Sequence, residues 1–495
     1  MENDSIDRGP RLYLLLCGVV SIICAGLVVY SQTAAFAWDE GFHMLAAQLI
    51  KGGKKPYIDF VFSQTPLNAY WNAGWMWVFG ESWRTVHAVA AVCTSGAVML
   101  TAGFVFGHFP IPRWRFAAAL AAACATGMNV LVVDFGTIGQ AYGFCLVLIV
   151  AAFRISILAV GRENAVTAAF AGLLAGAAAA SSLLTASVAP VLMLWMFVYN
   201  RAGNRWAKAT AFAAGVTVAF LPLLRLLIQS PRQVFFGVIE YNFRYRGVQW
   251  EKATGHNIDV TLSWIDSSHA LLLGLLAATG LLYIHFHGRF RTEWPAAKRA
   301  EFYLCGCLAL ALGVHISTAH PTFQRYYLLT VPFLAILAVV GLYWITAQMF
   351  HPDRPYPAVL LFIVLISLGL AKSLYEERDD WRWAEMEAIA RQVDQVTPPG
   401  GALLADEHVY FLTGRRPPSG MELADSHKLR FDAERSALLH VVSGPDLNRR
   451  IQAGVFQTVQ ICEDGLNVGD LDLKKLYVHQ AEVEDCTVFW ERAER

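Results

Sequence analysis

The chain has 495 residues, of which 56% are hydrophobic and only 16% are charged. Soluble proteins carry about 25% charged residues, so this composition excludes an ordinary soluble enzyme and is typical of a protein that crosses a membrane several times. The net charge of zero hides an uneven distribution: residues 376–495 hold 14 Lys and Arg against 23 Asp and Glu, and residues 1–375 hold 25 against 16. The sequence therefore predicts a membrane domain over 1–375 and an acidic, water-soluble domain over 376–495.

Hydropathy predicts about eleven transmembrane helices, each close to the roughly 20 residues that a bilayer requires. The fifth and sixth are short and could together form one kinked helix. The expected spans lie near residues 11–30, 85–107, 115–133, 141–160, 165–182, 184–199, 207–228, 269–288, 302–319, 326–347 and 357–375. The expected fold class is thus a polytopic α-helical membrane protein with a C-terminal domain outside the bilayer.

The loops between the spans predict the orientation. Lys and Arg are concentrated in one set of alternate loops, which includes the N-terminal segment, and the positive-inside rule places that set in the cytoplasm. With an odd number of spans, the C-terminal domain and the first long loop (31–84) then lie on the outer side of the membrane. One alternative stays open, because Arg8, Arg11, the apolar run and "AFA" ending at Ala37 also resemble a cleavable signal peptide.

The first outer loop begins with two adjacent acids, Asp39 and Glu40. Apolar residues at helical spacing over 42–50 predict a helix with Asp39 at its N-cap and a Gly-Gly pair at its end. The following "PYIDFVF" is expected to be extended, and "PLNAYWNAGWMWVFG" to form a second short helix. Its Trp and Tyr residues favour a membrane–water interface, so the loop is expected to lie on the outer leaflet.

The acidic domain predicts a small α/β fold. A helix is expected over 383–396 and another near 446–453, between strand-like pieces "GALLADEHVYFLTG", "ALLHVVSG", "FQTVQICE" and "KLYVHQAEV". Cys462 and Cys486 could form a disulfide or remain free. In the membrane domain, Gly172 and Gly176 have the spacing that lets two helices pack closely.

Several sets of polar residues fall on the predicted outer face. They are Asp39 and Glu40; Lys54 and Lys55; Asp134, with Tyr142 at the end of the same motif; His320, Arg325 and Tyr326; and Arg244 and Arg246. Each set has a structural explanation. Asp39 could only cap its helix, Lys54 and Lys55 could only touch anionic lipid, and Arg325 could extend from a helix end to water.

Together these groups suit a reaction on a lipid phosphate that carries a group to be transferred. A carboxylate would deprotonate an acceptor hydroxyl. Arginine would hold the phosphate with its bidentate fork and stabilise the charge that develops as the lipid phosphate leaves. A long lipid tail explains why such a site belongs to a membrane protein.

The stretch "DEGFHMLAAQLIKGGKKPYIDFVFSQTPLNAYWNAGWMWVFG" resembles the first outer loop of C-type (GT-C) glycosyltransferases, in the branch of protein O-mannosyltransferases and lipid A aminoarabinose transferases. "LVVDFGTIGQAY" resembles the second acidic loop of that family, "QRYYLLTVPFLAIL" a later segment and "DEHVYFLTGRRPPS" the outer domains of bacterial members. The resemblance implies that Asp39 is the catalytic acid/base residue, that Asp134 is the second acidic position and that Arg325 and Tyr326 contact the donor phosphate.

By the same resemblance, the expected reaction is inverting transfer from a polyprenyl-phosphate sugar to a hydroxyl of a cell-envelope lipid, glycan or protein. One departure is that Gln64-Thr65-Pro66 stands where many relatives have Lys-Pro-Pro, so Lys54 or Lys55 would have to replace that lysine. Some relatives use a divalent metal; Asp39, Glu40 and His43 are possible ligands, but the sequence requires no cofactor. No feature indicates a nucleic-acid partner.

Three other functions remain as alternatives. A transporter would place ionisable groups near the bilayer midplane and repeat its halves, whereas the predicted spans contain few such groups (Arg154, Arg225 and His315) and no repeat. A sugar-polymer ligase or polymerase of related fold would use arginine and histidine in a large outer loop. A structural membrane protein would leave the acids without a purpose. A glycosyltransferase accounts best for the acid pair.

Overall fold

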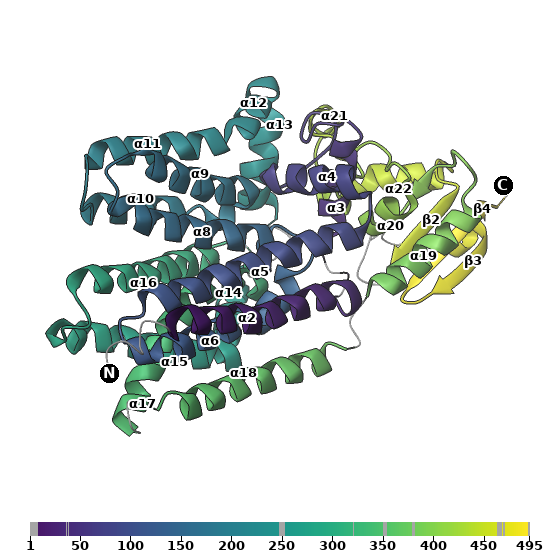
Figure 1. Ribbon diagram of the computed structural model, residues 1–495. Helices are drawn as coiled ribbons and strands as arrows, with labels where there is room; N and C mark the ends of the chain where they lie inside the picture. The colour runs from purple at the N-terminus through teal and green to yellow at the C-terminus, as the bar shows by residue number, and fades with distance from the viewer. Residues whose placement is uncertain are drawn as a thin grey trace. The chain divides into compact units, whose positions relative to one another are not determined.

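The computed structural model describes residues 8–35, 37, 39–246, 253–319, 321–349, 354–378, 382–462, 468 and 471–493. Most of these residues form helices, and a small β-sheet lies near the C-terminus (Figure 1). The chain divides into two compact units, each built from segments that are far apart in the sequence. Unit 1 comprises Met1–Thr33, His87–Leu221 and Trp250–Asp379, and unit 2 comprises Ala34–Val86, Pro222–Gln249 and Asp380–Arg495.

Unit 1 is a bundle of apolar helices. They are α2 (Arg8–Thr33), α5 (Trp83–His108), α6 (Arg115–Gly127), α7 (Val130–Gly136), α8 (Tyr142–Val160), α9 (Val166–Ser181), α10 (Val188–Val198), α11 (Arg205–Ala219), α14 (Ala253–Asp266), α15 (Ser268–Phe286), α16 (Ala296–Ser317), α17 (Val331–Met349) and α18 (Tyr356–Glu376), with short 3₁₀-helices η1 (Pro112–Trp114), η2 (Leu183–Thr185), η4 (Gly288–Phe290) and η5 (Gln324–Thr330).

Every predicted span coincides with an apolar helix or a broken pair of helices. Within the described residues, seven helices are long and apolar enough to cross a membrane, and the count rises to nine if each of two broken pairs is one span. One pair, α6 and α7, is bent by 53°. Helices α9 and α10 are apolar but shorter. The chain is therefore a multi-pass membrane protein by the length and composition of its helices, while the expected number of eleven spans remains a prediction.

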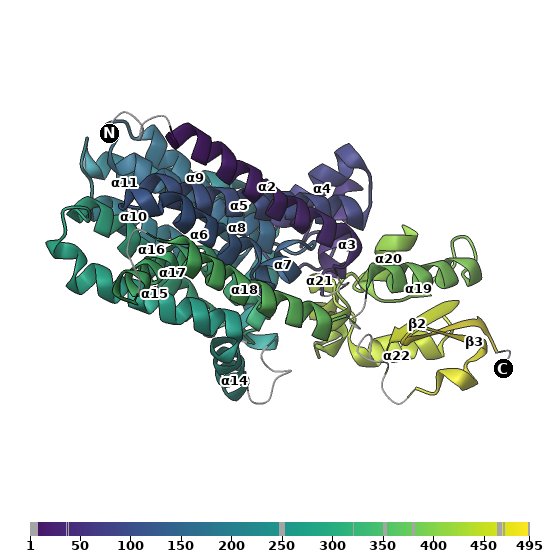
Figure 2. The same ribbon diagram turned by 60° about the horizontal axis from the view of Figure 1, so that its bottom comes forward.

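Helices α9 and α11 run side by side (Figures 1 and 2). A Cβ atom on Gly172 would lie 2.0 Å from the Phe212 carbonyl oxygen, and one on Gly176 would lie 2.8 Å from the Val216 Cα. Only glycine leaves room for backbones this close. The expectation of close packing at the Gly172–Gly176 spacing is confirmed.

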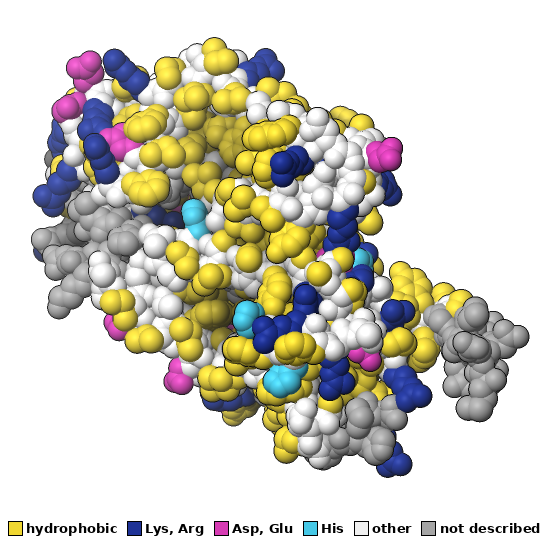
Figure 3. Space-filling view, turned by 90° about the vertical axis from the view of Figure 1, so that its left-hand side faces the viewer, with side chains coloured by type: hydrophobic (Ala, Val, Ile, Leu, Met, Phe, Trp, Pro, Cys, Tyr) yellow, Lys and Arg dark blue, Asp and Glu magenta, His cyan; other side chains and the backbone are white. Residues whose placement is uncertain are grey.

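The basic loops that alternate along the chain meet at one end of unit 1. The loops between α8 and α9, α10 and α11, and α15 and α16 all lie at the left of Figure 1. Figure 3 looks at this end and shows Lys and Arg side chains among apolar ones. Exposed arginines of these loops include Arg162, Arg205 and Arg289. These loops therefore share one end of the helix bundle, while their cytoplasmic location stays a prediction.

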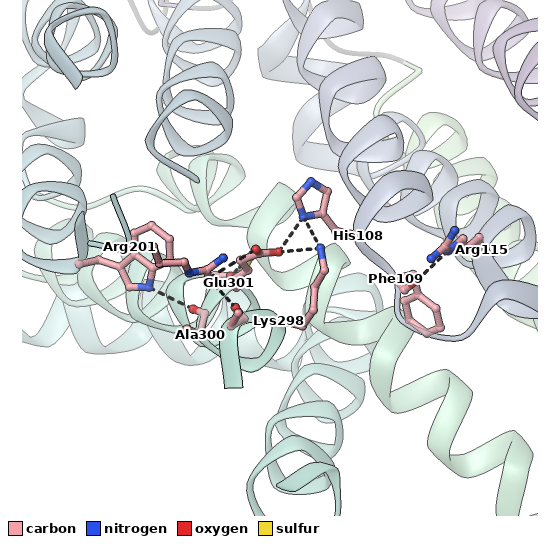
Figure 4. Close-up of polar contacts among 10 residues, drawn as sticks. His108, Phe109, Arg115, Arg201, Lys298, Ala300 and Glu301 are labelled. Carbon is pink, nitrogen blue, oxygen red and sulfur yellow. Dashed lines mark hydrogen bonds and ion pairs between the residues drawn. The ribbon is translucent and has the colours of Figure 1, made fainter. Parts of the chain in front are cut away.

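A buried carboxylate, Glu301, lies near the same end (Figure 4). It is 4% exposed. Its Oε2 atom lies 2.6 Å from Nδ1 of His108 and 3.3 Å from Nζ of Lys298, and its Oε1 atom lies 3.8 Å from Arg201. These three partners come from the end of α5, from α16 and from the segment after α10, so one buried acid links three parts of the bundle. No local sequence pattern predicts this cluster.

Unit 2 joins two loops of the membrane domain to the C-terminal region. Its helices are α3 (Gly41–Lys51), α4 (Leu67–Phe79), α12 (Leu221–Gln229), α13 (Pro231–Phe235), the π-helix η3 (Phe236–Tyr245), α19 (Trp383–Val396), α20 (Glu407–Thr413), α21 (Ala433–Leu439) and α22 (Gly444–Gln452), with 3₁₀-helices η6 (Ala424–Lys428) and η7 (Leu473–Lys475). Its strands are β1 (Leu403–Leu404), β2 (Thr458–Cys462), β3 (Tyr477–Val483) and β4 (Cys486–Arg492).

The four strands form one sheet in the order β1-β2-β4-β3. Strands β1 and β2 are parallel, and the other neighbours are antiparallel. Cys462 on β2 lies directly opposite Cys486 on β4, and the two form a disulfide. The sheet thus settles the pairing that the sequence left open. The expected helix over 383–396 is confirmed as α19, and that near 446–453 as α22.

Two expected strands are wrong. In "GALLADEHVYFLTG" the strand is limited to β1, and Glu407–Thr413 form helix α20, which is followed by Gly414 in a left-handed conformation. "ALLHVVSG" begins inside helix α21, where the Asp432 side chain caps the helix by accepting a hydrogen bond from the Arg435 N–H. Short apolar runs do not distinguish a buried helix from a strand, so the pattern alone could not separate the two.

The segment "PYIDFVF" is also not fully extended. Residues 57–59 form a turn in which Tyr57 has a positive φ of 65°. The Asp59 N–H donates to the Lys55 carbonyl, and Oδ2 of Asp59 accepts from the Lys55 N–H at 2.7 Å. The Asp59 side chain thus stabilises a turn that the aromatic pattern of the segment did not predict. The two flanking helices expected in this loop are confirmed as α3 and α4.

Candidate functional site

The predicted site residues are distributed over both units. Asp134, Tyr142, Arg325 and Tyr326 belong to unit 1, whereas Asp39, Glu40, His43, Lys54, Lys55, Arg244 and Arg246 belong to unit 2. His320 lies outside the described residues. Each group is a separate constellation with its own packing and electrostatics.

In unit 1, the acid of the second motif is held by a tyrosine from another helix. Asp134 lies on α7 and is 1% exposed. Its Oδ1 atom accepts a hydrogen bond of 2.9 Å from the Tyr30 hydroxyl at the end of α2. Helix α7 begins at Asn129, whose side chain caps it by accepting from the Leu131 N–H. Tyr30 was not anticipated, since nothing local to Asp134 points to it.

The first turn of α8 and the 3₁₀-helix η5 pack against α7 and bring the other residues of this group together. Arg325 on η5 is 7% exposed, and its guanidinium carbon lies 4.2 Å from the centre of the Phe323 ring and 5.7 Å from that of Tyr326. The Tyr326 ring lies 6.1 Å from Tyr142. Burial of the guanidinium among aromatic rings argues against a side chain that merely extends through lipid to water.

In unit 2, Asp39 and Glu40 have opposite environments. Asp39 is exposed, whereas Glu40 is 0% exposed, and Glu40 Oε1 accepts a hydrogen bond of 2.8 Å from the Trp383 indole N–H. The expected N-cap at Asp39 is wrong by one residue, because Glu40 occupies the N-cap position of α3 and makes no capping hydrogen bond with its side chain. The buried side chain of Glu40 faces α19 instead. The simple role of helix cap therefore does not explain Asp39.

The end of α3 agrees with the sequence. Gly52 is the C-cap, and Gly53 has a φ of +87°, a conformation that glycine adopts without strain. Lys54 and Lys55 follow this turn and are both exposed. They thus offer two cations close to the start of the outer loop, on the segment that continues from α3.

A third acid of unit 2, Glu422, was not anticipated. It is 9% exposed. Burial raises the pKa of Glu422 to about 7, although its own N–H, that of Gly420 and the charge of Lys54 all act to lower it. The Gly420 N–H donates to Oε2 at 2.9 Å. Only the tertiary structure reveals this acid, since an isolated Glu in a turn carries no sequence signal.

Arg244 and Arg246 lie at the end of η3. Arg244 has a side chain that is 75% exposed and lies 3.6 Å from Glu240, which also accepts a hydrogen bond of 2.9 Å from Arg435 on α21. The Asn242 side chain donates to the Ser63 carbonyl at 2.9 Å. These contacts fix η3 between the first outer loop and the C-terminal region, and Arg244 remains accessible to an anionic ligand.

Within the part of the chain that the structure describes, no three His, Cys, Asp or Glu side chains are arranged to hold a metal ion. Of the possible ligands Asp39, Glu40 and His43, the last two are buried, and Glu40 is bound by the Trp383 indole. The buried carboxylate of Glu40 is thus better described as a hydrogen-bond acceptor than as an open metal ligand.

No protein-family model and no curated protein matches the sequence. Two crystal structures of ArnT from Cupriavidus metallidurans are similar over almost the whole chain, each with 14% sequence identity. The structure bound to undecaprenyl phosphate has a TM-score of 0.65 and covers 96% of this chain and 97% of its own. The apo structure has a TM-score of 0.66 and covers 96% and 98%. The chain therefore has the fold of ArnT, in agreement with the fold that the first-loop resemblance implies.

Proposed function

We propose that this protein is a membrane glycosyltransferase that moves a sugar from a polyprenyl-phosphate donor to a hydroxyl group of a cell-envelope acceptor. The observation that carries the proposal is the shared fold over 96% of the chain with ArnT, a lipid A aminoarabinose transferase, in a structure that holds undecaprenyl phosphate. Asp39 and Arg325, which the sequence selects for the reaction, are an exposed carboxylate and a buried guanidinium.

In the proposed reaction, the acceptor oxygen attacks the anomeric carbon from the face opposite the phosphate. The bond between that carbon and the phosphate oxygen breaks, so the sugar inverts its configuration and polyprenyl phosphate leaves. Asp39 takes the proton of the acceptor hydroxyl as general base. Its exposure suits this role, because an acceptor hydroxyl can reach the carboxylate from solvent.

Arg325 is proposed to bind the phosphate of the donor. A guanidinium that is 7% exposed among aromatic rings lies in a medium of low dielectric constant, where its attraction for phosphate is strong. Tyr326 and Tyr142 would line the same position. Asp134, held by Tyr30, would accept hydrogen bonds from the sugar. Lys54, Lys55, Arg244 and Arg246 would attract the anionic headgroup, and His320 stays a candidate from the sequence alone.

The proposed location is the periplasmic face of a bacterial inner membrane, with the N-terminus in the cytoplasm. The support is the collection of basic loops at one end of unit 1 (Figure 3). One predicted span separates the segment of Asp134 from the nearest basic loop, and the same holds for the segment of Arg325. Both segments therefore belong to the end of the helices that is opposite the basic loops. A periplasmic reaction fits a donor whose lipid tail stays in the bilayer.

The test compares cells with and without the protein. Mass spectrometry of envelope lipids, glycans and proteins should find a sugar modification that disappears with the gene and returns with a plasmid copy. Purified protein should also bind undecaprenyl phosphate in a thermal-shift titration, with dodecyl phosphate as the short-chain control. An unchanged envelope together with no binding of undecaprenyl phosphate would contradict the proposal and favour a transporter.

A further inference from the structure

A tryptophan of the C-terminal region binds the residue next to the proposed base. Trp383 is the first residue of α19 and is 1% exposed. Its indole N–H donates to Glu40, 343 positions away in the sequence, at 2.8 Å. Because Glu40 is 0% exposed, replacing Trp383 would remove a hydrogen bond to a buried carboxyl group at a place where water does not readily substitute for it.

The backbone that follows Glu40 is fixed by the same region. A Cβ atom on Gly41 would lie 2.6 Å from the His408 ring, so the first turn of α3 packs directly against α20. The His408 ring in turn lies 5.4 Å from Trp383. Further along α3, the Gln48 side chain donates to the Phe411 carbonyl at 3.2 Å. Hence α19 and α20 fix both the position of α3 and its rotation about its axis.

The apolar face of α3 completes this arrangement. Met44, Leu45 and Ala47 share one hydrophobic core with residues of α19 and α20. The C-terminal region therefore supplies the surface on which α3 folds, together with the polar contact that anchors its first turn. Asp39 directly precedes the anchored residue and is itself exposed, so its position depends on that anchor.

A second tryptophan provides a natural control. Trp83 stacks on Trp383 with ring centres 5.3 Å apart and planes at 11°. It is 6% exposed, and its indole N–H donates to a different carboxylate, Glu387, at 2.8 Å. The two tryptophans thus match in size, burial and type of hydrogen bond. They differ in the acceptor: Glu40, which binds Trp383, is next to Asp39 in the sequence, whereas Glu387, which binds Trp83, is not.

We propose that Trp383 is a positioning residue: through its hydrogen bond to Glu40, the C-terminal region holds Asp39 in its reactive position. This inference rests on the proposed function. It assigns Glu40 to orientation of the base and gives the C-terminal region a part in catalysis.

The experiment replaces each tryptophan by phenylalanine, which keeps an aromatic ring and removes the N–H. The readouts are the amount of the envelope product per folded protein in cells, the melting temperature and the affinity for undecaprenyl phosphate. Trp383→Phe should lower product formation at least tenfold and leave the affinity within twofold. Trp83→Phe should lower the melting temperature by a similar amount and leave product formation within threefold.

A double variant separates positioning from general damage. If the Trp383–Glu40 contact acts as a unit, Trp383→Phe combined with Glu40→Gln should lose no more activity than the worse single variant. Equal activity losses in Trp383→Phe and Trp83→Phe, or losses that multiply in the double variant, would overturn the inference. Asp39→Asn tells the two proposals apart: if it retains full activity, the proposed function fails, whereas an inactive Asp39→Asn with unaffected Trp383→Phe refutes only the positioning role.

Discussion

The Tyr30 hydroxyl donates a hydrogen bond of 2.9 Å to Asp134, a residue 104 positions further along the chain. The contact joins the end of α2 to α7 and gives a defined orientation to an acid that is 1% exposed. A polar group buried in this way needs a hydrogen-bond partner, because an unsatisfied polar group is costly in a medium of low dielectric constant. Tyr30 is therefore the second residue, beside Trp383, that supports a proposed site acid from a remote segment.

Tyr30→Phe should destabilise the protein and weaken its activity. Hydrogen bonds to charged groups contribute about 1.5–3 kcal/mol, so we expect a lower melting temperature and a loss of product of about tenfold. The matched control is Tyr13→Phe, since Tyr13 lies on the same helix and is 48% exposed. Equal melting temperatures and activities in both variants would show that the Tyr30 contact does not matter to Asp134.

Asp39→Asn should remove the general base and leave the protein folded. General-base catalysis contributes about 10²–10⁴-fold, and an exposed side chain that does not occupy the N-cap position can change to an amide at little cost in stability. Product formation should fall by that factor, while undecaprenyl phosphate still binds. Asp259→Asn, an exposed acid on α14, serves as control. Wild-type product levels in the Asp39→Asn variant would show that Asp39 is not the general base and has only a structural role.

Arg325→Ala should weaken the binding of undecaprenyl phosphate by about tenfold to over a hundredfold, which corresponds to the roughly 1.5–3 kcal/mol of a charge-assisted hydrogen bond. Arg325→Lys should restore only part of the affinity, because lysine lacks the planar fork. Affinities come from thermal-shift or microscale titrations. Arg289→Ala, an exposed arginine at the basic end, should bind as the wild type does. An unchanged affinity in Arg325→Ala would remove Arg325 from the donor site.

The orientation can be measured with fusions at the C-terminus. Because the basic loops are predicted to be cytoplasmic and the number of spans odd, alkaline phosphatase fused after residue 495 should be active. Green fluorescent protein exported in unfolded form to the same place should stay dark. The reverse pattern would place the C-terminal region in the cytoplasm and contradict the proposed periplasmic reaction.

Glu422 should make stability depend on pH. Its pKa is raised from 4.5 to about 7 by burial, so the folded state holds the proton more tightly than the unfolded chain does. The stabilisation is complete below pH 4.5, decreases as pH rises and is lost above about pH 7. A shift from 4.5 to about 7 corresponds to roughly 3 kcal/mol.

Melting temperatures of purified protein between pH 4.5 and 8 test this expectation for Glu422. Glu422→Gln, which cannot ionise, should flatten the decrease, whereas Glu482→Gln, an exposed acid on β3, should leave it unchanged. The same slope in wild type and Glu422→Gln would assign the pH dependence to other groups.

The sequence by itself determined what depends on local periodicity. Long apolar runs predicted the helices of unit 1, because a backbone in lipid must satisfy its own hydrogen bonds. The helical spacing over 42–50 predicted α3, and the run from Trp383 to Val396 predicted α19 at its observed bounds. The family resemblance selected Asp39, Asp134 and Arg325 as candidates, and the fold that it implied is the one observed.

Only the tertiary structure decided which remote groups meet. The donors to Asp134 and Glu40 lie 104 and 343 positions away, and no local pattern encodes a hydrogen bond over that distance. The disulfide depended on the register of β2 and β4. Helices α20 and α21 formed where the sequence pattern was strand-like, with Gly414 at the end of α20 and Asp432 capping α21. The physical reason is that periodicity shows only which face of a helix or strand is buried. Packing between distant segments decides which element covers that face. The same packing sets the pKa of a buried acid such as Glu422.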